Sequence, residues 1–188
     1  MRKLIQQYAK DLTAGRLASG YEHSYRIYRL ARKIGEGMEY DDEVLHAACF
    51  LHDIEMSSGH PESSAEKARA ILGETGFASG KIEAVYQAIL YHMPGEEGGV
   101  HGEGTSIEGK LLHDANLLES VGAIGLIRLS IGSFFWHHLK TMDEVIELLK
   151  RWRGYAGSFF FPAARRLAER RIEFLDQAIG RFQEELQI

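Results

Sequence analysis

One apolar stretch, residues 44–55, constrains the fold of this chain more than any other. Its hydrophobic residues recur at intervals of three and four and also cover much of the remaining helix surface, which predicts a helix enclosed by neighbouring elements. The adjacent pair His52 and Asp53 lies near its end, and burying these polar side chains costs free energy unless they find partners. A divalent metal ion is one such partner, because it takes both imidazole nitrogen and carboxylate oxygen as ligands.

Length and charge limit the class of protein. The chain has 188 residues, of which 45% are hydrophobic, enough for one domain with a full core. We expect a single domain over residues 1–188, with its core motifs in about 21–129 and its C-terminal helices in about 142–187. The formal net charge of −5 disfavours a nucleic-acid partner. A small anionic substrate is still compatible with that charge, because a metal can supply local positive charge.

The sequence gives no sign of export or of membrane insertion. No run approaches the roughly 18 consecutive apolar residues of a membrane span, and Gln6 and Gln7 interrupt the apolar segment that a signal peptide needs. The single cysteine, Cys49, lies inside the apolar stretch and has no second cysteine to pair with, which fits a reducing compartment. These observations predict a cytoplasmic protein without a membrane partner.

Hydrophobic periodicity predicts helices along the whole chain, and no segment alternates as a strand would. Residues 63–66 and 105–108 have the pattern of capping boxes at helix starts. Residues 130–141 are expected to be irregular, and the glycine-rich residues 93–104 to form a loop that can act as a flap. The predicted class is all-α, with helices near residues 4–12, 21–34, 44–55, 63–72, 82–93, 107–126, 142–153 and 162–186.

Three of these predicted helices each place an ionisable residue on a face that should be buried. They are His23 on the second helix, His52 with Asp53 on the third, and Asp114 on the helix from 107. Two imidazoles and two carboxylates suit one shared divalent cation. Separate hydrogen bonds, or an ion pair of an aspartate with Arg26, are the alternative interpretation.

The order and spacing of these residues resemble the HD-domain metal-dependent phosphohydrolase superfamily. The two histidines are 29 positions apart, and the two aspartates are 61 positions apart. The Gly-Ala-Ile-Gly word at 122–125 and the residues 167–175 are similar to a group of bacterial uncharacterised HD hydrolases. The resemblance extends from about residue 21 to 185, and the local words that match its main motifs are residues 23–31, 47–54 and 113–125.

The resemblance implies an HD-domain helical bundle that binds a divalent metal ion. The ion is Mn, Fe, Co, Ni, Zn or Mg, and the implied ligands are His23, His52, Asp53 and Asp114. Close relatives often have aspartates where this chain has Asn116 and Glu119. If Asn116 rather than Asp114 occupies the ligand position, metal affinity should fall, because a neutral amide is a poorer ligand than a carboxylate.

The implied function is hydrolysis of a nucleotide or a similar small phosphorylated metabolite by attack of metal-bound water. The nucleotidase and nucleoside triphosphate pyrophosphohydrolase types are both compatible with the resemblance. A hydrolase of a signalling guanosine polyphosphate and a non-catalytic, nucleotide-binding regulatory module are the alternatives. Aromatic residues at 134–136 and 159–161 suit either core packing or contacts in a homo-oligomer.

Other residues are candidates for roles in substrate binding and proton transfer. Asp53 can orient the attacking water, because its second oxygen is the nearest base that the sequence supplies. His92, beside the glycine-rich loop, is a candidate catalytic proton donor or phosphate contact, and its alternative role is to satisfy carbonyls at a helix end. Arg26 can clamp a phosphate or pair with an acid. Arg128 and Arg171 are weaker phosphate candidates.

Overall fold

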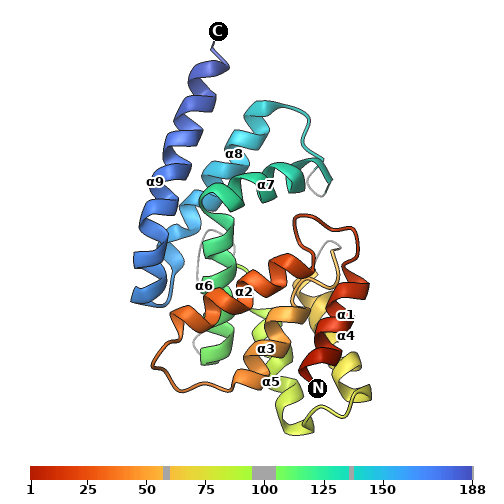
Figure 1. Ribbon diagram of the computed structural model, residues 1–188. Coiled ribbons are helices and arrows are strands. Elements are labelled where there is room, and N and C mark those ends of the chain that lie inside the picture. Colours follow the sequence, from red (N-terminus) through yellow and green to blue (C-terminus); the bar gives the residue numbers. More distant parts are fainter. Residues whose placement is uncertain (57–59, 95–104, 136–137, 188) are drawn as a thin grey trace.

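The computed structural model describes residues 1–56, 60–94, 105–135 and 138–187, and within them the protein is all-helical (Figure 1). No strand occurs in these ranges, which confirms the predicted fold class. The elements in chain order are α1 (Arg2–Leu12), α2 (Tyr21–Ile34), α3 (Asp42–Leu51), α4 (His60–Glu74), α5 (Ser79–Leu90), α6 (Ile107–Ser120), α7 (Ala123–Phe135), α8 (Met142–Gly154), the 3-10 turn η2 (Tyr155–Ser158) and α9 (Pro162–Glu185).

Helix α3 is the centre of the larger hydrophobic core. Asp41 caps its start by accepting hydrogen bonds from the backbone N–H groups of Glu43 and Val44. Every residue from Val44 to Leu51 is buried, and α1, α2, α5 and α6 surround the helix (Figure 1). The prediction that this stretch forms an enclosed helix is therefore confirmed.

The end of α3 differs from the prediction in a way that matters for the site. The helix stops at Leu51, so His52 is its C-terminal cap and Asp53 lies in the following turn rather than inside the helix. The side chain of Arg16 donates hydrogen bonds to the carbonyl oxygens of Asp53 and Ile54, at 3.0 and 3.3 Å. These bonds satisfy carbonyls that the end of the helix leaves without intrahelical partners.

Helices α6 and α7 are separate elements at an angle of 83°, so the predicted continuous helix from 107 to 126 is wrong. Gly122, between them, has φ +90°, a conformation that favours glycine. Gly125 packs against the end of α6, since a Cβ atom added to it would lie 2.2 Å from the carbonyl oxygen of Ser120. The prediction of irregular structure from 130 onward is also wrong as far as Phe135, where α7 ends.

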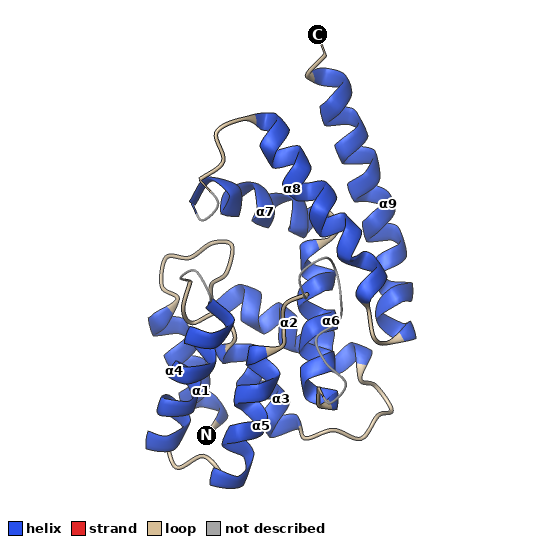
Figure 2. Ribbon diagram, turned by 180° about the vertical axis from the view of Figure 1, so that it is seen from behind, coloured by secondary structure: helices blue, strands red, loops and turns tan. Residues whose placement is uncertain are grey.

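A second, smaller hydrophobic cluster lies between α7, α8 and α9. Helix α9 runs along this part of the molecule and extends beyond the other helices at the C-terminus (Figures 1 and 2). No single described helix is long and apolar enough to cross a membrane. Taken together, α6 and α7 are long and apolar enough, but they are bent sharply where they meet. The buried members of the cluster are Val121, Leu129, Ile146, Leu149, Leu175 and Ile179.

Two helix starts differ from the predicted capping boxes. Helix α4 begins at His60, so residues 63–66 lie inside it. Helix α6 is capped by Ser106, which accepts from the backbone N–H of Gly109, and Glu108 instead accepts from the backbone N–H of Asp41. The loop predicted over 93–104 falls largely on residues 95–104, which lie outside the described ranges.

The close approach of Gly125 to α6 can be tested by substitution. Gly125→Ala should lower the free energy of unfolding by about 1–3 kcal/mol, because the added methyl group meets backbone atoms that cannot move aside. Gly154→Ala is the matched control, since the same atom there meets nothing within 4 Å and should raise stability by about 1 kcal/mol or less. Urea denaturation measures both. Equal stability of the two variants would contradict the proposed packing.

Candidate metal centre

Three side chains predicted as ligands converge at one end of the bundle. His23 lies in the first turn of α2, and His52 and Asp53 follow the last turn of α3. Their potential ligand atoms all lie within 4.8 Å of one another, and the residues are 0%, 0% and 6% exposed. The Nε2 atoms of the two histidines are 3.1 Å apart, and Asp53 Oδ2 lies 3.4 and 3.5 Å from them.

These separations fit one shared cation. Two ligand atoms about 2.1 Å from a metal are about 3.0 Å apart at a right angle and about 3.4 Å apart at a tetrahedral angle. The three observed separations fall within or close to this range. A divalent ion can therefore contact all three atoms with little rearrangement of the side chains.

The hydrogen bonds of the two histidines fix which ring nitrogen carries the proton. Nδ1 of His23 lies 2.8 Å from a carboxylate oxygen of Glu119, and Nδ1 of His52 lies 2.9 Å from the carbonyl oxygen of Cys49. Both partners are acceptors, so each Nδ1 is protonated, and in the neutral ring each Nε2 presents a lone pair to the cluster. Two lone pairs and a carboxylate repel one another at these distances, and a bound cation turns that repulsion into attraction.

Burial keeps His52 in the form that binds metal. Loss of solvent around its ring lowers the pKa of His52 to about 4, and this effect exceeds the opposing influence of Asp53. The imidazole is therefore neutral at pH 7, as a metal ligand must be. The chemistry of the two histidines and Asp53 thus matches the divalent ion expected from the sequence.

His92, the predicted catalytic histidine, lies beside this cluster. It follows the C-terminal cap of α5, and its Nδ1 donates to the carbonyl oxygen of Ile89 at 2.6 Å. Its Nε2 lies 3.7 Å from Asp53 Oδ1, and its ring centre is 4.9 Å from that of His52. Asp53 therefore faces the two ligand histidines with one oxygen and His92 with the other.

Asp114 does not join the cluster, so its prediction as the fourth metal ligand is corrected. Its two carboxylate oxygens accept hydrogen bonds from the backbone N–H groups of Phe160 and Phe161, both at 2.9 Å. It also lies 3.1 Å from Nδ1 of the neighbouring His113. The carboxylate thus holds the segment that leads into α9, on the side of α6 away from His23.

The side of α6 that faces the site carries Asn116 and Glu119, which are one helical turn apart. The amide of Asn116 lies 3.6 Å from the sulfur of Met93, the residue after His92. Glu119 is 2% exposed and bonds His23. Sequence reasoning assigned Glu119 no role, although an acid at the end of a buried helix requires a partner and was a signal that could have found it.

Glu119 carries its negative charge next to the candidate metal ligands. Burial opposes its ionisation, but hydrogen bonds from His23 and Arg26 outweigh burial and lower the pKa of Glu119 to about 2. Arg26, predicted as a phosphate clamp, is therefore found in the alternative role of an ion pair with an acid. Carboxylates that accept a hydrogen bond from a ligand histidine orient its ring and make it a stronger ligand.

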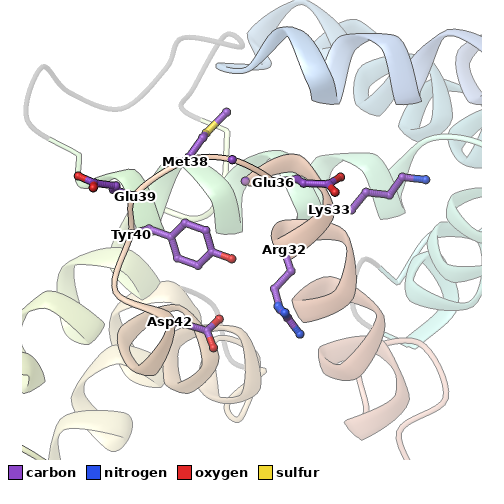
Figure 3. A pocket seen from close by; sticks show the side chains of 9 residues that line it. Arg32, Lys33, Glu36, Met38, Glu39, Tyr40 and Asp42 are labelled. Atoms are coloured by element: carbon purple, nitrogen blue, oxygen red, sulfur yellow. The ribbon is translucent and has the colours of Figure 1, made fainter.

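A surface pocket of about 680 Å³ lies at the other end of α2, about 18 Å along the helix from His23. Figure 3 shows that Arg32, Tyr40 and Asp42 point toward one another there. Asp42 is already engaged by Arg2 and by the hydroxyl of Tyr28. Acidic and basic side chains neutralise one another in this pocket. It should therefore attract a small anion less strongly than the cluster at His52 does once a metal ion is bound.

The fold and the site define an all-helical protein with a buried site of two histidines and one carboxylate. Residues 20–120, more than half of the chain, match the family model described as HD domain. The chain therefore belongs to the HD domain family, as the sequence resemblance implied. No curated protein matches the chain at a significant level.

Solved structures of similar fold include proteins from three bacteria. A Lactobacillus plantarum protein is 22% identical with a TM-score of 0.80, over 99% of this chain and 96% of that one. Bacillus subtilis YpgQ, solved in complex with ADP, is 22% identical with a TM-score of 0.74, over 98% and 97%. A predicted HD superfamily hydrolase from an uncultured Thermotogales bacterium is 26% identical with a TM-score of 0.61, over 98% and 90%. Together with the histidine and aspartate cluster, family membership supports a metal-dependent hydrolase.

The different positions of Asp53 and Asp114 predict different effects of the same substitution. Asp53→Ala should abolish stoichiometric metal binding in a folded protein. Asp114→Ala should bind metal normally but lose about 3 kcal/mol of stability, because two backbone N–H groups lose their acceptor. Metal content after dialysis and chemical denaturation measure the two effects. Loss of metal from natively folded Asp114→Ala would restore Asp114 as a ligand.

The lowered pKa of Glu119 predicts a pH-dependent contribution to stability. A carboxyl group whose pKa falls from 4.5 to about 2 on folding stabilises the protein above about pH 4.5, and this contribution is lost as the pH falls toward 2. In chelator, the wild type should exceed Glu119→Gln in stability by on the order of 3 kcal/mol at pH 6, and the difference should shrink below pH 4.5. Urea denaturation from pH 6 to 3 tests this, and a constant difference would contradict it.

Proposed function

We propose that this protein is a divalent-metal-dependent phosphohydrolase that acts on a nucleotide or a similar small phosphorylated metabolite. The observation that carries the proposal is the convergence of two unprotonated imidazole nitrogens and the Asp53 carboxylate on one point, in a chain of the HD domain family. The structure of Bacillus subtilis YpgQ in complex with ADP supports a nucleotide as the substrate class. The reaction would then be of the nucleotidase or the pyrophosphohydrolase type.

His23, His52 and Asp53 are the residues that would hold the ion. A bound divalent ion polarises a phosphoryl oxygen and makes water a better nucleophile. Asp53 has an oxygen on the ion's side and another facing His92, so it can accept a proton from an attacking water. His92, with its Nδ1–H tied to Ile89, is oriented so that Nε2 can hold or pass on a proton.

Asn116 favours a second candidate function, a nucleotide-binding module without turnover. The sequence resemblance implies an aspartate at this position in many relatives, and the cluster found among the described residues contains a single carboxylate. Fewer carboxylates lower the affinity for a divalent ion but also leave more of its charge for an anionic ligand. The two functions therefore differ in turnover and agree in metal-dependent binding.

Metal content and product release together test the proposed function. Wild-type protein purified without chelator should contain about one divalent ion per chain. It should also release phosphate or pyrophosphate from at least one member of a nucleotide panel. Asp53→Ala should lose both properties, while Asp143→Ala, an exposed aspartate on α8, should keep both.

The possible results separate the two candidates. Metal with nucleotide binding but no release of phosphate or pyrophosphate would favour the binding module. Failure to bind Mn²⁺, Fe²⁺ or Zn²⁺ even after reconstitution would overturn both. Identification of the released product would distinguish a nucleotidase from a pyrophosphohydrolase.

A further inference from the structure

Arg128 reaches the candidate metal centre from outside the elements that carry the ligands. It lies on α7, next to the smaller hydrophobic cluster, and its side chain is 14% exposed. Its Nε donates to the carbonyl oxygen of Ala18 at 2.6 Å. One terminal nitrogen lies 3.2 Å from Nε2 of His23, and the other lies 3.5 Å from the Glu119 carboxylate.

The contact with His23 uses the lone pair that a metal ion would need. A guanidinium nitrogen can only donate, so Nε2 of His23 accepts from Arg128 with its lone pair, and the proton of the neutral ring is on Nδ1, toward Glu119. Arg128 can donate only to that lone pair, so Arg128 and a metal ion are mutually exclusive partners of this atom. Binding of the ion therefore releases one amino group of Arg128 from its acceptor.

The released amino group stays at the edge of the metal centre. The bond to Ala18 and the proximity of Glu119 hold the guanidinium in place independently of His23. Its freed N–H groups would then lie beside the three candidate ligand atoms, in a buried environment where a charged hydrogen bond is strong. A planar guanidinium at this position suits the oxygens of a phosphoryl group.

The other arginines near the site are committed elsewhere. Arg26 pairs with Glu119, Arg16 donates to the carbonyl oxygens of Asp53 and Ile54, and Arg171 donates to the carbonyl oxygen of Leu118 at 2.6 Å. Arg128 differs from these three arginines, because its side-chain nitrogen lies against Nε2 of His23, the atom with which this residue would bind the ion.

The charges of the site also favour an anion after the ion has bound. The carboxylates of Asp53 and Glu119 compensate the guanidinium groups of Arg26 and Arg128. The charge of a divalent ion is then left for the substrate. An anion with oxygens in reach of both the ion and Arg128 gains from both, so metal and anion should bind cooperatively.

We propose that Arg128 is a substrate-contacting residue whose guanidinium exchanges His23 for a phosphoryl oxygen when the metal ion binds. This inference rests on the proposed function, because it assumes that His23 binds a metal ion. It assigns to α7 the part of the site that recognises the anionic group. The purely structural alternative is that Arg128 only ties α7 to the loop that contains Ala18.

Calorimetric titrations with Mn²⁺ and then inorganic phosphate test the exchange in the folded protein. In wild type, phosphate should bind Mn²⁺-loaded protein at least tenfold more tightly than metal-free protein. Arg128→Gln should bind Mn²⁺ as tightly as wild type or more tightly, because a competitor for His23 is gone, but should bind phosphate at least tenfold more weakly. Arg171→Gln is the matched control, an arginine that also links the C-terminal helices to α6, and should leave both affinities unchanged.

The outcomes distinguish this inference from the function on which it rests. No Mn²⁺ binding by wild type would overturn the proposed function and the inference with it. Normal Mn²⁺ binding with unchanged phosphate affinity in Arg128→Gln would overturn the inference alone. If Arg128→Gln does not fold, Arg128→Lys replaces it, since it keeps the charge but cannot reach Ala18 and a phosphate together. Unchanged phosphate affinity in a folded Arg128→Lys would equally overturn the inference.

Discussion

The helices bring three electron-rich groups together, and the need to offset their mutual repulsion is the constraint on which the site depends. The Nε2 atoms of His23 and His52 and the carboxylate of Asp53 lie 3.1–3.5 Å apart in a buried environment. No rotation of the histidines relieves this repulsion cheaply, because each Nδ1–H is already bound to an acceptor. Arg128 offsets the repulsion at His23 alone, whereas a cation between all three atoms would attract each of them, so the hydrogen bonds around the cluster favour a metal ion there.

These hydrogen bonds come from the ends of helices. His52 and His92 each follow a helix and donate Nδ1–H to the carbonyl oxygen three residues earlier, in α3 and α5 respectively. Each bond satisfies a terminal carbonyl and at the same time orients the ring toward Asp53. The C-terminal ends of helices also carry partial negative charge, which favours a cation where α3 and α5 end. One arrangement thus stabilises the fold and builds the site.

The sequence predicted the all-helical class, the enclosed helix α3, and the grouping of His23 with His52 and Asp53. Periodicity placed Asp114 on the buried face of α6 and did not single out Glu119, but this helix is buried on nearly all sides, so periodicity cannot choose the side that faces the site. The turn of α7 away from α6 depends on a positive φ at Gly122, a conformation that no hydrophobic pattern records. The first error concerns the direction in which a buried side chain points, and the second concerns the direction of a helix.

The second error has consequences for function, because the direction of α7 determines where Arg128 lies. The family model ends at residue 120, so the candidate metal ligands fall inside the matched segment and Arg128 falls outside it. Gly125 brings α7 against the end of α6, and from there Arg128 extends to Ala18 and His23. The family segment thus supplies the groups that can hold an ion, and the helices after it supply a cation aimed at what the ion binds. On the role proposed for Arg128, changes in α7 would alter the binding of the anionic group while the candidate metal ligands stay the same.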